Sequence, residues 1–200
     1  MNIPQSSLIE VIVSESVLDD TTSYGSGGLW EPYKIEGTPD ELVNIWGKST
    51  YDHFERLYND PEDRAAAGVR FLSAFHLSET SDVIPIPSWS DIVDDFRSLS
   101  SEELNNFDSL VPKGTYYPKE TFISGQTFKT YTVDQSYYLK YLTEKLMKRG
   151  VTFEKKSVTR IDEFDVEFDV VVNCCGIQGS NICGDEVPCY SIRGQVVRIK

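Results

Sequence analysis

Three short segments of this 200-residue sequence carry residue types suited to binding a nucleotide. The first is the apolar run from Leu8 to Val13, which predicts a buried strand and is followed closely by Glu15. In a doubly wound nucleotide-binding fold, an acid at this place accepts hydrogen bonds from ribose hydroxyls, about 20 residues after a glycine-rich turn that holds the pyrophosphate. Because only 14 residues precede Glu15, we expect that turn to lie upstream of Met1.

The second segment places hydroxyl groups beside glycines. Residues 21–23 read T-T-S, and residues 25–28 read G-S-G-G. Hydroxyls next to flexible backbone suit phosphate and polyol oxygens, because they offer donors without a bulky side chain that blocks close approach. An ordinary surface loop has the same composition, so both interpretations stay open here, and a loop is the expected conformation. The spacing of these glycines does not match G-x-G-x-x-G, and that motif occurs nowhere in the sequence.

The third segment is D-V-V-V-N-C-C-G at Asp169 to Gly176, an apolar run that ends in small residues. This pattern predicts a buried strand over residues 168–174 that leads into a tight turn. Ligands of open α/β sheets bind at such carboxyl ends of strands. Any buried strand with a tight exit has the same pattern, so this segment alone does not specify a ligand.

Composition and charge exclude several classes of partner. The net charge of -13 argues against nucleic acid and anionic membrane surfaces, because binding polyphosphate requires a basic surface. No run approaches the roughly 18 apolar residues of a transmembrane helix, and residues 1–5 lack the charged start and apolar core of a signal peptide. We therefore expect no nucleic-acid partner and no membrane association.

The cysteines and histidines indicate neither a metal site nor a hydrolase. All four cysteines lie between Cys174 and Cys189, far in sequence from the two histidines, His53 and His76. A zinc site usually combines two Cys-x-x-Cys pairs or a pair with histidines, so we expect reduced thiols packed at a strand end and in the following loop, with no metal. Neither histidine has a nucleophile motif beside it, which argues against a catalytic triad.

Hydrophobic periodicity predicts the elements that position these segments. The predicted helices cover residues 39–58, 61–67, 91–96, 101–107 and 133–149, the last ending at Gly150. The predicted strands cover residues 8–13, 69–77, 151–158, 168–174 and 193–200. Two more antiparallel strands are predicted between residues 116 and 132, separated by a break at Gly125-Gln126. This order predicts a mixed α/β fold, in which parallel strands of a partial nucleotide-binding fold enclose an antiparallel insertion.

Five segments, taken in this order, resemble the D-amino-acid oxidase family, which includes D-aspartate oxidase. They are G-G-L-W-E-P-Y at 27–33, P-S-W-S-D-I-V-D-D-F-R-S-L-S at 87–100, Y-L-K-Y-L-T at 138–143, V-V-N-C-C-G at 171–176 and Y-S-I-R-G-Q-V-V at 190–197. The resemblance covers nearly the whole chain. It implies a partial FAD-binding nucleotide fold with an antiparallel substrate-domain insertion, and it places the first strand with its G-x-G-x-x-G and a C-terminal third outside this sequence.

The resemblance also implies a domain organisation. Residues 1–60 and 133–180 match the FAD-binding domain, and residues 61–132 match strands and short helices of the substrate domain. Residues 181–200 match the start of further substrate-domain strands.

By the same resemblance, one group of residues matches positions that bind the adenosine and pyrophosphate parts of FAD. Glu15 matches the acid that meets the adenosine ribose. Ser16 stands where many members have arginine, which would weaken the contact near the adenosine. Thr21, Thr22 and Ser23 match a threonine-rich segment that hydrogen-bonds the pyrophosphate and ribityl region.

Other residues match positions near the flavin ring and the adenine. Gly27, Gly28 and Leu29 match a segment whose backbone approaches the isoalloxazine, where a side chain at the glycines would clash. Val158 matches a position that touches adenine through its backbone. Cys175 replaces a frequent threonine, which puts a hydroxyl contact there in doubt.

One further substitution lies close to the matched flavin segment. Glu31 takes the place of a usual glutamine near the active-site mouth of the family. We expect its extra negative charge to disfavour acidic substrates.

The resemblance implies oxidative deamination of a D-amino acid to a 2-oxo acid, ammonia and hydrogen peroxide, with FAD as cofactor and oxygen as second substrate. The family holds the substrate carboxylate with an arginine and tyrosines that would lie beyond Lys200. We therefore expect no catalytic residue within this sequence, and no activity of these 200 residues alone. The resemblance allows a homodimer of the full-length protein and a peroxisomal or cytoplasmic location, for which the sequence carries no signal.

Two other functions stay open. The chain could belong to a catalytically dead homologue that binds a partner or nucleotide through the remaining scaffold. It could also belong to another amine-oxidising flavoprotein, such as a relative of glycine or sarcosine oxidase. The W-E-P-Y segment at 30–33 and the P-S-W segment at 87–89 favour the D-amino-acid oxidase family over the latter.

Overall fold

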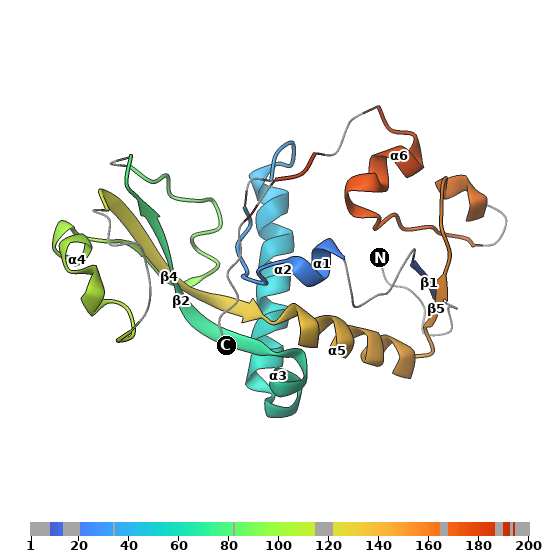
Figure 1. Ribbon diagram of the computed structural model, residues 1–200, viewed down its shortest axis with the longest axis horizontal. Helices are drawn as coiled ribbons and strands as arrows, with labels where there is room; N and C mark the ends of the chain where they lie inside the picture. The colour runs from blue at the N-terminus through green and yellow to red at the C-terminus, as the bar shows by residue number, and fades with distance from the viewer. Residues whose placement is uncertain are drawn as a thin grey trace. The chain divides into compact units, whose positions relative to one another are not determined.

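The computed structural model describes residues 9–13, 21–33, 35–81, 83–114, 122–164, 168–186, 190–192 and 194 (Figure 1). It confirms the mixed α/β class, because it contains one parallel and one antiparallel sheet. The chain divides into two compact units. The first unit comprises Met1–Ser26 with Leu142–Lys200, and the second comprises Gly27–Tyr141. The predicted division into FAD-binding and substrate domains stays a prediction.

The first unit contains a parallel strand pair. Strand β1 (Glu10–Val13) pairs with β5 (Thr152–Lys155), with Glu10 opposite Thr152 and Val13 opposite Lys155. Gly150 precedes β5 with φ +84°, in the left-handed conformation expected for a glycine that ends a helix. Both strands run in the same direction, so their carboxyl ends lie at one edge of the pair, where nucleotide folds bind their ligands.

The helices described in the first unit are short, apart from the end of one longer helix. They are α1 (Thr22–Gly25), η2 (Ile161–Phe164), η3 (Gly176–Gln178) and α6 (Gly179–Cys183), and the longer helix α5 (Gln135–Lys148) begins in the second unit. Helix α5 confirms the helix predicted over residues 133–149. Its last turn carries Lys145 and Lys148, whose charges suit the negative end of the helix dipole.

The second unit is built around a three-stranded antiparallel sheet in the order β2-β4-β3. Its strands are β2 (Val69–Ser78), β3 (Asp94–Ser98) and β4 (Ser124–Val133), and its helices are α2 (Asp40–Asn59), α3 (Pro61–Ala67), α4 (Ser101–Asn105) and η1 (Phe107–Ser109). Figure 1 shows β2 and β4 running side by side past α2. These elements confirm the helices predicted over 39–58, 61–67 and 101–107 and the strand predicted over 69–77.

Helix α2 packs its apolar stripe against this sheet. The buried Tyr51 meets Tyr131 of β4 edge to face, with ring centroids 4.9 Å apart, and Tyr58 meets Phe71 of β2 at 6.0 Å. The helix begins with two acids, which suit the positive end of the helix dipole. Among the described contacts, no side chain caps its first turn.

One predicted helix is a strand. Residues 91–96 were expected to be helical from the spacing of their apolar residues, but residues 94–98 form β3 and pair with β4. The pairing shifts register between Asp94 and Arg97, and Asp95 takes a positive φ of 55° at this irregularity. Pairing with the free edge of β4 outweighs the local helical spacing, since strand formation depends strongly on tertiary partners.

The two strands predicted between residues 116 and 132 are also wrong in part. Gly125 and Gln126, expected to interrupt them, lie inside the single strand β4. A Cβ at Gly125 would lie 2.7 Å from the Leu99 side chain and 3.1 Å from that of Leu77. The glycine therefore lets other residues pack closely over the strand instead of ending it. Residues 115–121 lie outside the described ranges.

The strand predicted over residues 168–174 does not form. Val170, Val171 and Val172 are 59%, 37% and 73% exposed and belong to no strand. A buried parallel strand needs partners on both sides, and the parallel sheet contains only β1 and β5 within the described residues. The strand predicted over 193–200 lies outside the described residues except for Gly194.

Candidate functional site

The hydroxyl-rich segment of the first unit forms a helical turn, not the expected loop. Thr21 precedes α1, and its Oγ1 accepts a hydrogen bond from Tyr24 N at 3.1 Å, as an N-cap residue does. The exposed side chains of Thr22 and Ser23 make no hydrogen bond with any residue that the structure describes. Both hydroxyls therefore remain available to a ligand, while the Thr21 oxygen is already used within the turn.

A second candidate position follows the parallel strands. Lys156 N donates to Val13 O at 2.9 Å, which continues the β1–β5 pairing one residue past β5. Within the described ranges, no hydrogen bond occupies the backbone N–H or C=O of Val158, two residues further on. These free groups at the carboxyl end of a strand suit the edge of a nucleotide base, which is the contact that the resemblance implies for Val158.

Cys175 lies in a turn held by the side chain of Asn173. Asn173 Oδ1 accepts from Cys175 N at 3.1 Å, and its Nδ2 donates to Gly179 O at 2.9 Å. Cys174, Cys175 and Cys183 are free thiols and are exposed, so the expectation that the described cysteines pack into the structure is wrong. They are exposed because the strand expected to carry residues 168–174 into a sheet does not form.

Gly27, Gly28 and Leu29 lie in the second unit, where this segment extends the antiparallel sheet. Val133 N donates to Gly28 O at 2.9 Å, Trp30 N donates to Tyr131 O at 2.8 Å, and Leu29 bridges Thr132. These contacts use the edge of β4 that β3 occupies further along, because β2 covers the other edge over its whole length.

Gly28 takes a φ of +68°, and a Cβ built there would overlap the carbonyl oxygen of Val133. Glycine is thus required at this position by the chain itself, whether or not a flavin binds.

Two indole groups fasten the residues that follow Gly28. Trp30, which is 5% exposed, donates its Nε1–H to Gly47 O at 3.1 Å, and its carbonyl accepts from Thr130 Oγ1 at 2.9 Å. Trp89 Nε1 donates to Pro32 O at 3.0 Å. We call residues 28–33 the strap, since these bonds tie them to α2, to β4 and to the segment before β3.

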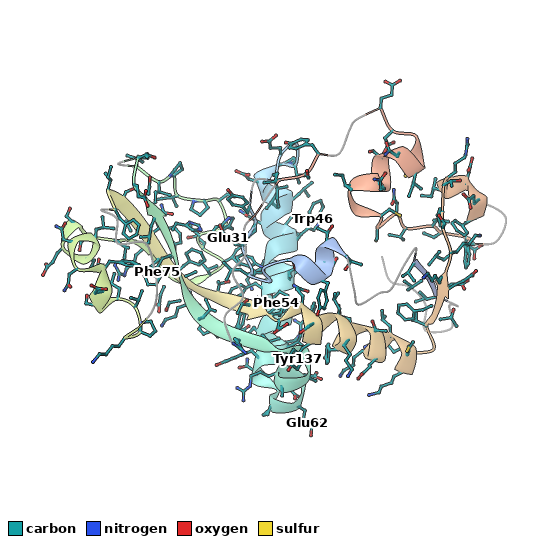
Figure 2. All side chains as sticks on the ribbon, in the orientation of Figure 1. Glu31, Trp46, Phe54, Glu62, Phe75 and Tyr137 are labelled. Atoms are coloured by element: carbon teal, nitrogen blue, oxygen red, sulfur yellow. The ribbon has the colours of Figure 1, made fainter. Side chains whose placement is uncertain are left out.

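Glu31 of the strap forms an ion pair that the sequence did not predict. Glu31, labelled in Figure 2, places its Oε1 2.8 Å from His76 Nε2 on β2. The hydrogen bond to Glu31 raises the pKa of His76 above its usual 6.5, and burial opposes this shift. When His76 is protonated, its positive charge offsets the negative charge of Glu31. In that protonation state, Glu31 gives no electrostatic reason to expect that acidic substrates are disfavoured.

Strand register explains why this pair escaped prediction. Glu31 and His76 are 45 residues apart in sequence. The signal that could have found them is the alternation of β2, which puts His76 on the same face as its cross-strand neighbour Gln126. Unless the pairing of β2 with β4 is known, the sequence gives no sign that Glu31 and His76 lie close together.

Two predicted site residues, Glu15 and Ser16, lie outside the described residues. Of the others, Thr21–Ser23, Val158 and Cys175 belong to the first unit, and Gly27–Leu29 belong to the second. No cluster of three or more His, Cys, Asp or Glu side chains within the described ranges could hold a metal ion. No helix described here has the length and apolar character needed to cross a membrane.

Comparison with known proteins places these features in a family. Residues 7–200 match the model of a protein family described as FAD dependent oxidoreductase. Human D-aspartate oxidase is 26% identical to the chain over 189 residues, which cover 94% of this chain and 51% of that protein. D-amino-acid oxidase of Rubrobacter xylanophilus is 30% identical over 190 residues, with coverage of 94% and 51%. D-amino-acid oxidase of Schizosaccharomyces pombe is 31% identical over 197 residues, with coverage of 96% and 52%. The chain thus spans about half the length of these curated relatives.

Proposed function

Because the chain belongs to the FAD dependent oxidoreductase family, we propose that its protein is an FAD-dependent D-amino-acid oxidase. The observation that carries this proposal is the similarity to D-aspartate and D-amino-acid oxidases, which extends over 94–96% of the chain. The proposed reaction consumes a D-amino acid, oxygen and water, and yields a 2-oxo acid, ammonia and hydrogen peroxide. When bound, FAD would supply the redox chemistry by accepting two electrons from the substrate and passing them to oxygen.

The described residues of the first unit fit the adenosine and pyrophosphate end of FAD. Thr22 and Ser23 offer hydroxyl donors in a one-turn helix, and Thr21 can still donate its own proton while its oxygen caps that helix. The free backbone groups of Val158 suit the adenine edge. We assign Glu15 to a contact with the ribose and Ser16 to a weaker contact near the adenosine. We assign Cys175, in the turn at residues 173–176, to another weak contact with FAD.

The strap of the second unit fits the flavin end. The resemblance assigns Gly27, Gly28 and Leu29 to close backbone contact with the isoalloxazine. Hydrogen bonds to β4 hold the backbone of this segment in a fixed position, and a pre-organised backbone is what such a contact needs. The homodimer and the peroxisomal or cytoplasmic location stay predictions from the resemblance.

Removing the two free hydroxyls tests the assignment in the first unit. The double variant Thr22→Ala with Ser23→Ala in the full-length protein is expected to weaken FAD binding roughly tenfold or more, because each hydroxyl donates to an anionic oxygen. Titration of the apoprotein with FAD, followed by flavin fluorescence, measures the change. Ser49→Ala, at an exposed position of α2, is the matched control and should leave the affinity unchanged. Equal affinity of the double variant and wild type would remove these residues from the site.

The 200-residue chain by itself is expected to bind FAD negligibly. It lacks the G-x-G-x-x-G turn whose backbone N–H groups offset the charge of a pyrophosphate, and its own charge of -13 opposes an anionic ligand. Titrating the purified chain into FAD should produce no saturable quenching of flavin fluorescence. Tight and saturable quenching would show that the described residues suffice for binding.

The reaction is tested on the full-length open reading frame. Incubation with a panel of neutral, acidic and basic D-amino acids should release hydrogen peroxide, with the matching L-amino acids as controls. A panel of this breadth is needed because the relatives include both D-aspartate and D-amino-acid oxidases. A purified protein that contains flavin but is inert to every D-amino acid would leave another flavin reaction as the function, and one that is colourless and inert would favour a dead homologue.

A further inference from the structure

The far end of the strap is held differently from its beginning. Residues 28–30 are fixed by backbone bonds to β4, which do not depend on pH in the neutral range. Beyond them, the Trp89 indole donates to Pro32 O, and the His76 imidazole pairs with the Glu31 carboxylate. The second of these involves a group that titrates near neutrality.

The Glu31–His76 pair is shielded from water. The Glu31 and His76 side chains are 17% and 27% exposed. At this degree of burial, a charge-assisted hydrogen bond is screened less than a surface pair, and its loss leaves a carboxylate in a poorly hydrated place.

The described neighbours of the His76 ring are mostly aromatic. Phe128 of β4 lies edge-on at 5.1 Å from the imidazole centroid, and Trp89 lies at 6.1 Å. Gln126 donates its Nε2–H to Ile84 O at 2.8 Å, while its buried Oε1 has no hydrogen-bond partner among the described residues.

The charge balance at His76 involves few groups. Among the described residues, Glu31 is the one charged group that acts on its pKa, and the Gln126 side chain makes a smaller contribution in the same direction. An unpaired buried carbonyl near the ring favours the protonated imidazole, because an unsatisfied acceptor is costly in the interior.

We propose that Glu31 and His76 form a pH-sensitive latch that fastens Glu31 of the strap to the antiparallel sheet. With His76 protonated, the ion pair closes the latch. With His76 neutral, Glu31 loses its cationic partner and is held less tightly, while residues 28–30 stay paired with β4 and Trp89 keeps its bond to Pro32 O. This device lies wholly within the second unit and does not depend on the proposed oxidase activity.

The direction of the pH dependence follows from the histidine. The pKa of His76 is raised in the folded chain, so the stabilisation is fully present below its ordinary value of 6.5 and is lost as pH rises through the raised pKa. The latch therefore closes on the acidic side of neutrality and opens on the basic side.

Hydrogen–deuterium exchange of the full-length protein tests the latch. Exchange is measured between about pH 5.5 and about pH 8.5, the range in which a histidine titrates, and is corrected for intrinsic rates. In wild type, protection of the peptide that contains residues 29–33 is expected to fall roughly fivefold as pH rises, the factor typical of a modest ion pair. Glu31→Gln and His76→Gln should each remove this pH dependence.

The other histidine provides the matched control. His53 hydrogen-bonds Tyr138 in the same unit, and burial lowers its pKa, so His53→Gln should retain the pH dependence of the strap. Protection of the α5 peptide, residues 135–148, shows whether a variant has lost its fold as a whole. Wild-type protection that does not change with pH would overturn the proposal, as would a pH dependence that persists in both Glu31→Gln and His76→Gln. If either variant fails to fold, the comparison of the wild-type pH profile with that of His53→Gln decides.

Discussion

Replacing Phe128 with alanine is expected to lower the free energy of unfolding of the second unit by about 3–5 kcal/mol. Its side chain is 1% exposed and is among the largest fully buried ones. The ring meets His76 at 5.1 Å, Trp89 at 5.2 Å and Phe96 at 6.1 Å between centroids. Alanine would leave a cavity between these aromatic rings, and the rigid strand β4 cannot collapse to fill it.

Urea unfolding followed by tryptophan fluorescence measures this loss, because all three tryptophans, Trp30, Trp46 and Trp89, lie in the second unit. Trp46→Phe is a suitable control, since Trp46 is 59% exposed and its substitution should change the free energy of unfolding by less than about 0.5 kcal/mol. A loss below about 1 kcal/mol for Phe128→Ala would mean that this cluster is not the core of the unit.

Gly28→Ala is expected to destabilise the second unit by about 3 kcal/mol or more. Alanine at a φ of +68° is strained, and its Cβ would overlap the carbonyl oxygen of Val133, the residue whose N–H donates to Gly28 O. The strap can relieve the overlap only by giving up its pairing with β4. Loss of that pairing would also release the backbone that the proposed function places against the flavin.

Gly37 provides a control that separates backbone strain at positive φ from overlap of the new Cβ with Val133. It has a similar φ of +74°, but a Cβ there would meet no atom within 4 Å. Gly37→Ala should therefore cost only the strain of the backbone, about 1 kcal/mol. Urea midpoints of the two variants measure the difference, and equal midpoints would show that close approach to Val133 does not constrain the strap.

Long periodic segments were predictable from the sequence, and segments that depend on distant partners were not. Helices α2 and α5 and strand β2 follow local patterns that extend over 10 residues or more. Residues 91–96 have helical spacing, yet the open edge of β4 recruits the adjacent residues 94–98 as β3. Gly125 has the sequence pattern of a break, and its role in close packing under leucine side chains depends on residues far away in the sequence.

The same distinction applies to the candidate site: some of its residues were predictable from the sequence, and others were not. Residue types and the family resemblance indicated Thr21–Ser23 and Gly27–Leu29, because hydroxyls and glycines stand together in the sequence. The Glu31–His76 pair could not be predicted, since it depends on the path of the strap across the sheet and on the register of β2. It also changes the expectation for substrates, because Glu31 is part of an ion pair and not an isolated negative charge when His76 is protonated.

The most direct test of the central claim is anaerobic reduction of the bound flavin in the purified full-length protein. We predict that the protein carries FAD and that its flavin absorbance bleaches when a D-amino acid is added, but not when the matching L-amino acid is added. This readout requires cofactor binding and electron transfer from the substrate, and it is independent of oxygen. Bound flavin that no D-amino acid reduces would contradict the assignment as a D-amino-acid oxidase.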